Sequence, residues 1–232
     1  LARPDLNEAQ LTAALADEGL RMQVNLGFEN SYALAIAGPL ARKSTLRYIS
    51  DLKDQPALRT AFSHEFLNRE DGWPALRQTY QLPQQPSGIE HALAYSAIEA
   101  GQLDLTDAYT TDGELAVRDL VLLEDDREFF PAYSALLLAR TDLPPRAAQV
   151  LSRLNSIIDE TTMQGLNNVV ASEGQSPAAV ASAFLQEQGL VTGPAHVENN
   201  RTRRILDNTL THLKLTGIAL LLACAVAIPL AL

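Results

Sequence analysis

The chain has 232 residues, 47% of them hydrophobic, which is enough for one large domain or two small ones with a buried core. Its net charge is −10, and no stretch combines clustered Lys and Arg with interleaved aromatic residues, so we expect no nucleic-acid partner. The single cysteine, Cys224, excludes an internal disulfide framework and a cysteine-based metal site.

Helical and strand-like patterns alternate over the first 140 residues. The patterns predict helices over residues 5–19 and 88–100 and strands over residues 31–37, 57–63, 103–111, 120–125 and 134–140. Asp5 is a candidate N-cap of the first helix, and Gly19 and Gly101 are candidate helix stops. This alternation implies an α/β fold with a mainly parallel sheet.

From Pro144 onward the pattern is helical. We expect three successive helices, the second beginning at Asp159 as its N-cap and the third at Ser176-Pro177. Residues 191–204 are polar and contain Gly and Pro, which indicates a linker.

The end of the chain is apolar. Leu215–Leu232 carries no charge and reaches the length that a membrane-spanning helix requires, so we expect a transmembrane helix rather than a buried helix of a soluble core. The chain opens at Leu1 without an initiator Met or a signal-peptide pattern, so we expect it to begin inside a longer protein.

Catalytic, metal and cofactor motifs are absent from the sequence. There is no G-x-S-x-G, P-loop or HExxH motif. Glu90 next to His91 suggests an acid/base pair, but a carboxylate at a helix start beside a partly buried histidine accounts for both. The four histidines lie on different expected elements without metal-ligand spacing: His64, His91, His196 and His212. We therefore expect neither an enzyme nor a metalloprotein.

Four strings of the first 140 residues are distinctive, namely GFENSYALAI, EFLNREDGWPALRQTY, GIEHALAYSAIEAGQLDLTDAYTTD and LVLLEDDREFFPAYSALLLAR. They resemble those of the substrate-binding proteins of glycine betaine/choline-type osmoprotectant ABC importers. Two later strings, IIDETTMQGLNNVV and SPAAVASAFLQEQGL, resemble the closing helices of that domain. The segment from Ile205 onward resembles the opening of the cognate permease subunit.

The resemblance implies a two-lobed, type II periplasmic-binding-protein (Venus-flytrap) fold, N-terminally incomplete and followed by a transmembrane helix. Two α/β lobes joined by crossing strands close on a ligand in such a fold. In this fold, residues 1–37 would end the first pass of the chain through lobe one, residues 38–114 would form lobe two, and residues 115–190 would return to lobe one. Residues 191–204 would form a linker, and residues 205–232 would begin the permease.

The implied function is extracytoplasmic binding of a quaternary-ammonium osmoprotectant, namely glycine betaine, choline or carnitine, for uptake by an ABC importer. The implied partners are the permease region of the same chain and a cytoplasmic ATPase subunit, at the cell (inner) membrane with the binding domain on the periplasmic side. Two alternatives stay open: a domain of the same fold for another small cation or an amino acid, and a membrane-tethered enzyme.

A trimethylammonium group has no N–H to donate, so proteins surround it with the electron-rich faces of aromatic rings. Three tyrosines match the family's cage motifs: Tyr32 in NSYALAI, Tyr109 in DAYTTD and Tyr133 in FFPAY. Taken singly, each would be read as a packing residue with its hydroxyl at the core rim. The other three tyrosines match no cage motif and are expected to pack: Tyr48, Tyr80 and Tyr95.

Two polar residues complete the expected site. Arg69 matches the arginine that in betaine-binding relatives reaches the ligand's carboxylate, and the alternative is a salt bridge to Glu70 or Asp71. Asn30 precedes Tyr32 by two positions, so its side chain points to the same side of a strand and is expected to hydrogen-bond a ligand oxygen.

Overall fold

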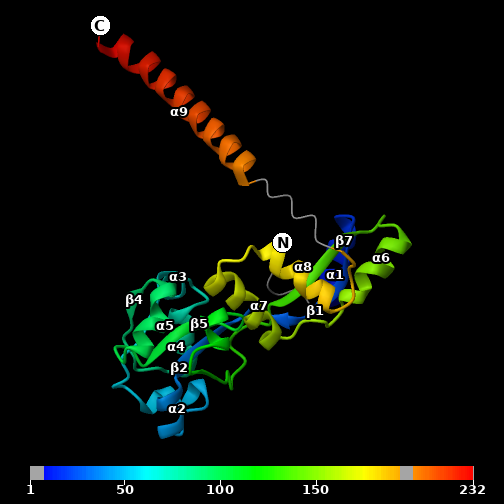
Figure 1. Ribbon diagram of the computed structural model, residues 1–232. Coiled ribbons are helices and arrows are strands. Elements are labelled where there is room, and N and C mark those ends of the chain that lie inside the picture. The colour runs from blue at the N-terminus through cyan, green and yellow to red at the C-terminus, as the bar shows by residue number, and fades with distance from the viewer. Residues whose placement is uncertain (1–7, 194–200, 232) are drawn as a thin grey trace. The chain divides into compact units, whose positions relative to one another are not determined.

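The computed structural model describes residues 8–193 and 201–231. The chain divides into two compact units, Leu1–Leu190 and Val191–Leu232 (Figure 1). The first unit contains α1 to α8 and the strands, and the second contains α9. The α/β class expected from the sequence is confirmed for the first unit.

A three-stranded sheet forms the centre of residues 30–130. Strand β2 (Tyr32–Ala37) lies between β5 (Leu105–Tyr109) and β6 (Leu120–Leu123) and is antiparallel to both. The four residues 33–36 of β2 are buried, because this strand is apolar on both faces and covered on both.

A shorter pair of strands extends this sheet. Strands β3 (Ala61–Ser63) and β4 (Ser87–Ile89) are parallel, and a parallel bridge from Thr60 to Leu105 connects them to β5. The expectation of a mainly parallel sheet is therefore confirmed for β3, β4 and β5, but it is wrong at the centre of the sheet, where β2 is antiparallel to both neighbours. Strand β2 runs against both neighbours because it enters from β1 instead of following a helical crossover.

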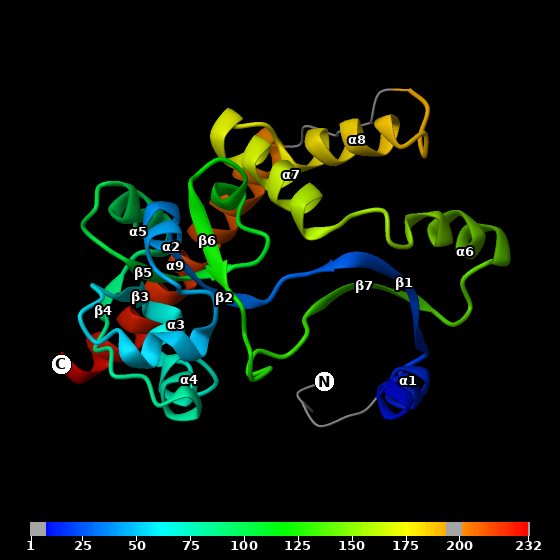
Figure 2. The ribbon, with the colours of Figure 1, turned by 90° about the horizontal axis from the view of Figure 1, so that it is seen from below.

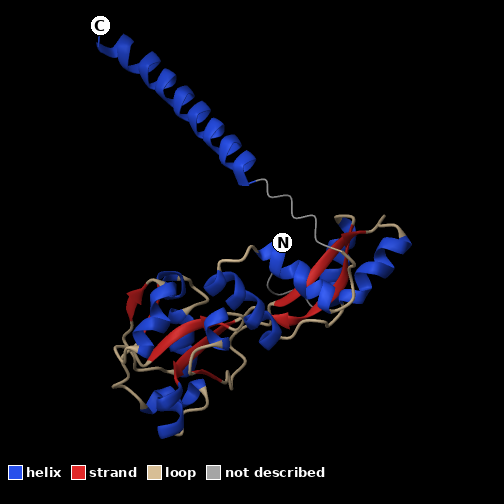
Figure 3. Ribbon diagram, in the orientation of Figure 1, coloured by secondary structure: helices blue, strands red, loops and turns tan. Residues whose placement is uncertain are grey.

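Helices pack around this sheet, as Figures 2 and 3 show: α2 (Gly38–Lys43), α3 (His64–Asn68), α4 (Trp73–Tyr80) and α5 (His91–Glu99). The main core joins β2 to this layer, since Leu34 and Ile36 share a cluster with Phe62, Phe66 and Leu76. All five side chains are fully buried. Tyr80 and Tyr95 are buried too, as expected for packing residues.

The remaining part of the first unit is built on a long two-stranded ribbon. Strand β1 (Leu20–Glu29) follows α1 (Glu8–Asp17) and pairs antiparallel with β7 (Ser134–Arg140) (Figure 2). Three helices follow β7, namely α6 (Pro145–Leu151), α7 (Glu160–Glu173) and α8 (Pro177–Glu187). The expected caps of α7 and α8 are confirmed, because Asp159 and Ser176 accept backbone N–H bonds at 2.8 and 3.2 Å.

Helix α7 docks onto the loop that follows β5. Gln164 and Asn167 donate side-chain hydrogen bonds to the carbonyls of Thr110 and Thr111, both at 2.8 Å. At Gly113, which opens η2 (Gly113–Ala116), a Cβ would lie 2.6 Å from the backbone nitrogen of Asn168. The ribbon and its helices are therefore held close to the end of β5.

The expected divisions at 37/38 and 114/115 do not coincide with these sheets. Strands β2 and β6 lie in one sheet with β5. The chain crosses between ribbon and sheet near residue 30, where β1 gives way to β2, and again between β6 and β7.

The C-terminal unit consists of α9 (Arg201–Ala231). Residues 201–204, expected in the linker, are helical, and residues 194–200 lie outside the described residues, as do Asp5 and His196. Within the described part of the chain, no helix combines the length and apolar character that crossing a bilayer requires. This finding does not support the transmembrane helix expected over residues 215–232.

Candidate functional site: an aromatic cluster at the end of β2 and β5

Two of the expected cage tyrosines lie side by side. Tyr32 and Tyr109 are directly opposite each other in the β2–β5 pair. Their ring centroids are 4.8 Å apart with planes tilted by 33°, and Tyr109 Oη donates to Tyr32 Oη at 3.0 Å. Opposed residues of antiparallel strands share one face of the sheet, so the two rings form one continuous wall.

Both hydroxyls are held in the neutral form. Burial, followed by the hydrogen bond with Tyr109, raises the pKa of Tyr32 above its ordinary value. Burial also raises the pKa of Tyr109. The wall therefore offers two aromatic faces and carries no charge of its own at physiological pH.

Two phenylalanines that sequence reasoning missed extend the wall. The Tyr32 ring centroid lies 5.1 Å from that of Phe66 and 6.3 Å from that of Phe130. Phe66 and Phe130 are themselves 6.1 Å apart. Phe130 belongs to the FFPAY string that was quoted for Tyr133, so this string was the sequence signal from which Phe130 could have been predicted. Tyr32, Tyr109, Phe66 and Phe130 are called the aromatic cluster below.

Helix α3 and its C-cap place Phe66 and Arg69 next to Tyr32. Ser63 is the N-cap of α3, and its Oγ accepts from Phe66 N at 3.2 Å. The fully buried carboxylate of Asp107 on β5 accepts bonds from Ser63 N and Oγ, both at 2.6 Å. A buried carboxylate needs such partners, so this contact ties α3 to the strand that carries Tyr109.

Arg69 reaches both the cluster and two carboxylates. Its Cζ lies 5.8 Å from the Tyr32 ring centroid. Its Nε and Nη2 donate to the two oxygens of Asp71 at 2.8 and 2.7 Å, and Nη1 is 3.5 Å from Glu65 Oε1. The expected alternative of an ion pair with Asp71 is thus present, together with a second acid, Glu65, that the sequence did not indicate.

Tyr133 and Asn30 lie at the edge of this arrangement. Asn30 N donates to the Tyr133 carbonyl at 3.0 Å, and Tyr133 is 42% exposed. The hydrogen bond to Asp71 is the main cause of the raised pKa of Arg69, and the nearby Tyr133 phenol makes a smaller contribution. Asn30 is exposed, and its Oδ1 accepts a hydrogen bond from Thr111 Oγ1 at 2.8 Å. The structure thus gathers Tyr32, Tyr109 and Arg69 and leaves the other two at the rim.

Asp112 holds the backbone of Tyr109 in place. Its Oδ2 accepts from Tyr109 N at 2.8 Å and from the Tyr95 hydroxyl, and it lies 3.0 Å from His91 Nε2. Burial raises the pKa of Asp112, but hydrogen bonds from His91, Tyr95 and Tyr109 N outweigh it and leave that pKa below its ordinary value. The His91 and Tyr109 rings meet in a T-shaped arrangement, with centroids 5.4 Å apart.

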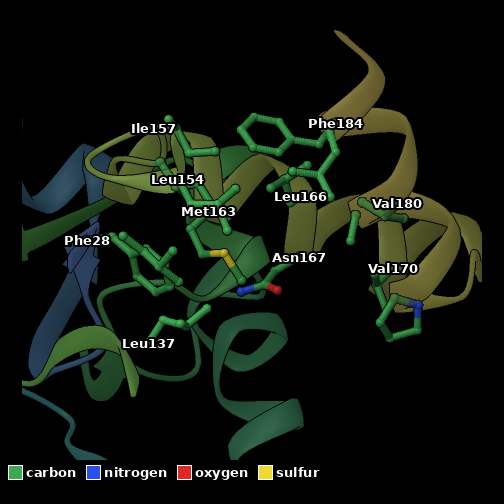
Figure 4. A pocket seen from close by; sticks show the side chains of 15 residues that line it. Phe28, Leu137, Leu154, Ile157, Met163, Leu166, Asn167, Val170, Val180 and Phe184 are labelled. Atoms are coloured by element: carbon green, nitrogen blue, oxygen red, sulfur yellow. The ribbon is translucent and has the colours of Figure 1, made fainter. Parts of the chain in front are cut away.

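A separate cavity lies away from the aromatic cluster. It has a volume of about 390 Å³ and is lined mostly by apolar side chains of β1, β7, α7 and α8, including Phe28, Met163 and Phe184 (Figure 4). None of its lining residues belongs to the aromatic cluster. An apolar lining of this kind offers no carboxylate or ion pair with which to recognise a charged ligand.

The comparisons with known proteins decide the family. Residues 4–187 match the family described as the substrate binding domain of the ABC-type glycine betaine transport system. The chain belongs to this family. Its members bind substrates for transport and are not enzymes. This confirms the expectation from the sequence that the protein is not an enzyme.

Curated relatives agree with this assignment. The chain is 34% identical over 170 residues to an ergothioneine transport permease/ergothioneine binding protein of Helicobacter pylori, covering 71% of this chain and 31% of the relative. It is 30% identical over 173 residues to a carnitine transport binding protein of Listeria monocytogenes, covering 72% and 56%. The chain therefore spans from about a third to just over half of the length of these relatives.

A solved structure supports the fold. A glycine betaine/carnitine/choline ABC transporter structure superimposes with a TM-score of 0.73 at 28% identity, covering 82% of this chain and 72% of that one. The expected type II periplasmic-binding-protein fold is confirmed for the first unit.

The His91–Asp112 pair predicts a pH-dependent contribution to stability. The hydrogen bond to Asp112 raises the pKa of His91 above 6.5, while partial burial opposes the rise. A raised pKa in the folded state stabilises it below the unfolded value, and this gain is lost as the pH rises through the folded value. His91→Gln should therefore cost more free energy of unfolding near pH 5.5 than near pH 9.

Urea denaturation at the two pH values measures this difference. His64→Gln is the matched control, because the His64 side chain is 63% exposed and its nearest acid, Glu90, is 4.0 Å away. An equal loss for His91→Gln at both pH values would show that the imidazolium–Asp112 contact contributes nothing.

Proposed function

We propose that this chain binds a quaternary-ammonium osmoprotectant, such as glycine betaine, choline or carnitine, outside the cytoplasm for uptake by an ABC importer. The observation that carries the proposal is the cross-strand wall of Tyr32 and Tyr109, extended by Phe66 and Phe130. Family membership and the carnitine-binding relative support the same ligand class.

The chemistry of the aromatic cluster suits such a ligand. A quaternary amine is held by aromatic faces within about 6 Å of their ring centroids, and each contact contributes about 0.5 to 2 kcal/mol depending on desolvation. The acids beside the aromatic cluster add negative potential. Burial is the main cause of the raised pKa values of Tyr32 and Tyr109, and the Glu65 carboxylate raises both pKa values further.

Three further residues have proposed roles. Tyr32 and Tyr109 lie side by side, so a second wall has to face them, and Tyr133 at the rim is our candidate. Arg69 is the candidate contact for a ligand carboxylate, because its planar fork suits bidentate binding. Asn30 Oδ1 is engaged by Thr111, so its amide nitrogen is the group proposed to donate to a ligand oxygen.

We propose that residues 30–130 form one lobe and that the β1–β7 ribbon with its helices forms the other. These two regions correspond to the sheets described above, and the aromatic cluster lies where β1 passes into β2 and where the chain approaches β7. Ligand binding between two lobes that close by a hinge would bring the rim residue Tyr133 toward the wall.

One comparison supports an alternative class of ligand for the same site. The Helicobacter pylori relative is named for ergothioneine transport, so a different small cation or an amino acid is the alternative ligand class. Competition by such compounds against a bound quaternary amine distinguishes the two.

Tyr109→Ala should weaken binding of a quaternary amine about 2- to 30-fold, because it removes one aromatic face. Tyr109→Phe retains the face and loses only the hydroxyl that bonds to Tyr32, so its effect should be smaller. Calorimetric titration of the full-length protein with glycine betaine, choline and carnitine measures both variants.

Tyr48→Ala is the control, because Tyr48 contacts Arg47 and has no role in the aromatic cluster. Unchanged affinity in Tyr109→Ala would refute the cage role of Tyr109. An absence of heat with all three ligands in the unmutated protein would refute the proposed function itself.

We also propose that the chain is part of a protein that joins this domain to a permease in the inner membrane, served by a cytoplasmic ATPase subunit. The Helicobacter pylori relative combines a permease and a binding protein under one name, and the segment from Ile205 onward, which includes the uncharged stretch Leu215–Leu232, resembles a permease opening. The full-length protein should stay in the membrane fraction after alkaline carbonate extraction. Its release by carbonate would contradict the proposal.

A further inference from the structure

We propose that Asp71 sets ligand selectivity by competing with the ligand's carboxylate for Arg69. The inference rests on the proposed function and concerns how the site distinguishes two classes of quaternary amine, those that carry a carboxylate and those that do not. Asp71 lies in the EFLNREDGWPALRQTY string, but no part of the proposed function assigns it a role in ligand binding, and the role proposed here follows from its contacts.

Asp71 occupies one of the two edges of Arg69 that can bind a ligand carboxylate bidentately. The Nε and Nη2 atoms of Arg69 form one of the two edges through which guanidinium binds a carboxylate bidentately. Both donate to Asp71, at 2.8 and 2.7 Å. A ligand carboxylate can reach this edge only if Asp71 leaves it.

A tight turn between α3 and α4 holds Asp71 in this position. Arg69 is the C-cap of α3, its N–H bonding to the carbonyl of Glu65 at 3.0 Å and its carbonyl accepting from Gly72 N at 3.1 Å. Gly72 lies so close to the chain that a Cβ there would be 2.2 Å from the carbonyl oxygen of Phe66. The backbone thus presents Asp71 to Arg69 independently of any ligand.

The charges beside Tyr32 sum to a negative value. Arg69 supplies one positive charge, and Asp71 and Glu65 supply two negative charges within 4.0 Å of it. A ligand with a trimethylammonium group alone meets a favourable potential here. A ligand that also bears a carboxylate must either displace Asp71 or take the remaining edge of Arg69, where Nη1 lies 3.5 Å from Glu65. In both cases its carboxylate lies near acids, so Asp71 shifts the site toward ligands without a carboxylate.

The size of the effect follows from exposure. The side chains of Arg69 and Asp71 are 40% and 59% exposed, so water screens the ion pair. Replacing Asp71 by a ligand carboxylate on Arg69 therefore costs little free energy. Removing the Asp71 charge frees Arg69 for a zwitterion and lowers the negative potential felt by a simple cation. Both changes move selectivity in the same direction, by about three- to tenfold together.

The test compares glycine betaine with choline on the full-length protein by calorimetric titration. Asp71→Asn should raise the affinity for glycine betaine relative to that for choline by about three- to tenfold. In an Arg69→Gln background the gain for glycine betaine should disappear, because no guanidinium is left to release.

Asp142→Asn is the matched control. Asp142 binds Arg140 with the same two-residue spacing and the same bidentate geometry, at 2.8 and 2.6 Å, in the turn after β7. This variant should leave the glycine betaine to choline ratio unchanged.

Three results would overturn the inference while the proposed function stands: an unchanged ratio in Asp71→Asn, a shift toward choline, or an equal shift in the control. A shift toward choline would show that Asp71 preorganises Arg69 for the ligand's carboxylate. If neither ligand binds the unmutated protein, the proposed function fails, and this inference fails with it.

Discussion

The register between β2 and β5 is the constraint on which the candidate site depends. Side chains alternate faces along a strand, so a shift of one residue would move Tyr32 away from Tyr109 and the apolar set of β2 out of the core. Burial of Ala33 to Ile36 opposes that shift from within the strand. At the strand end, Asp112 holds Tyr109 N, and Thr110 N donates to the Ser31 carbonyl at 2.9 Å.

Acidic side chains position the rest of the site around this pair, each through a different contact. Asp107 anchors the N-cap of α3 and so brings Phe66 beside Tyr32, while Asp112 fixes the end of β5. Asp71 and Glu65 hold Arg69 over the Tyr32 ring. The same carboxylates that organise the structure leave the surroundings of the aromatic cluster negative, which suits a cationic ligand.

Local patterns predicted α1, α5 to α8 and strands β2, β3 and β5 to β7, but they did not indicate strand β1 or helices α3 and α4. Tyr32 and Tyr109 were proposed because each lies in a string that resembles the family's and at the end of a strand pattern, and the structure places them opposite each other. Their role as cage residues stays a prediction. Phe66 and Phe130 were missed because their approach depends on α3 docking and on the path of the chain before β7, contacts far apart in sequence. The partners of Arg69 depend on the turn at Gly72, and the direction of β2 depends on which strands it pairs with.

The central claim is that the wall of Tyr32 and Tyr109 is where the quaternary ammonium group binds. A crystal structure of the full-length protein with glycine betaine or choline tests it most directly. Our account predicts the methyl groups against both rings, with the nitrogen within about 6 Å of each ring centroid. A ligand bound elsewhere, for example in the apolar cavity beside Phe28 and Met163, would contradict it.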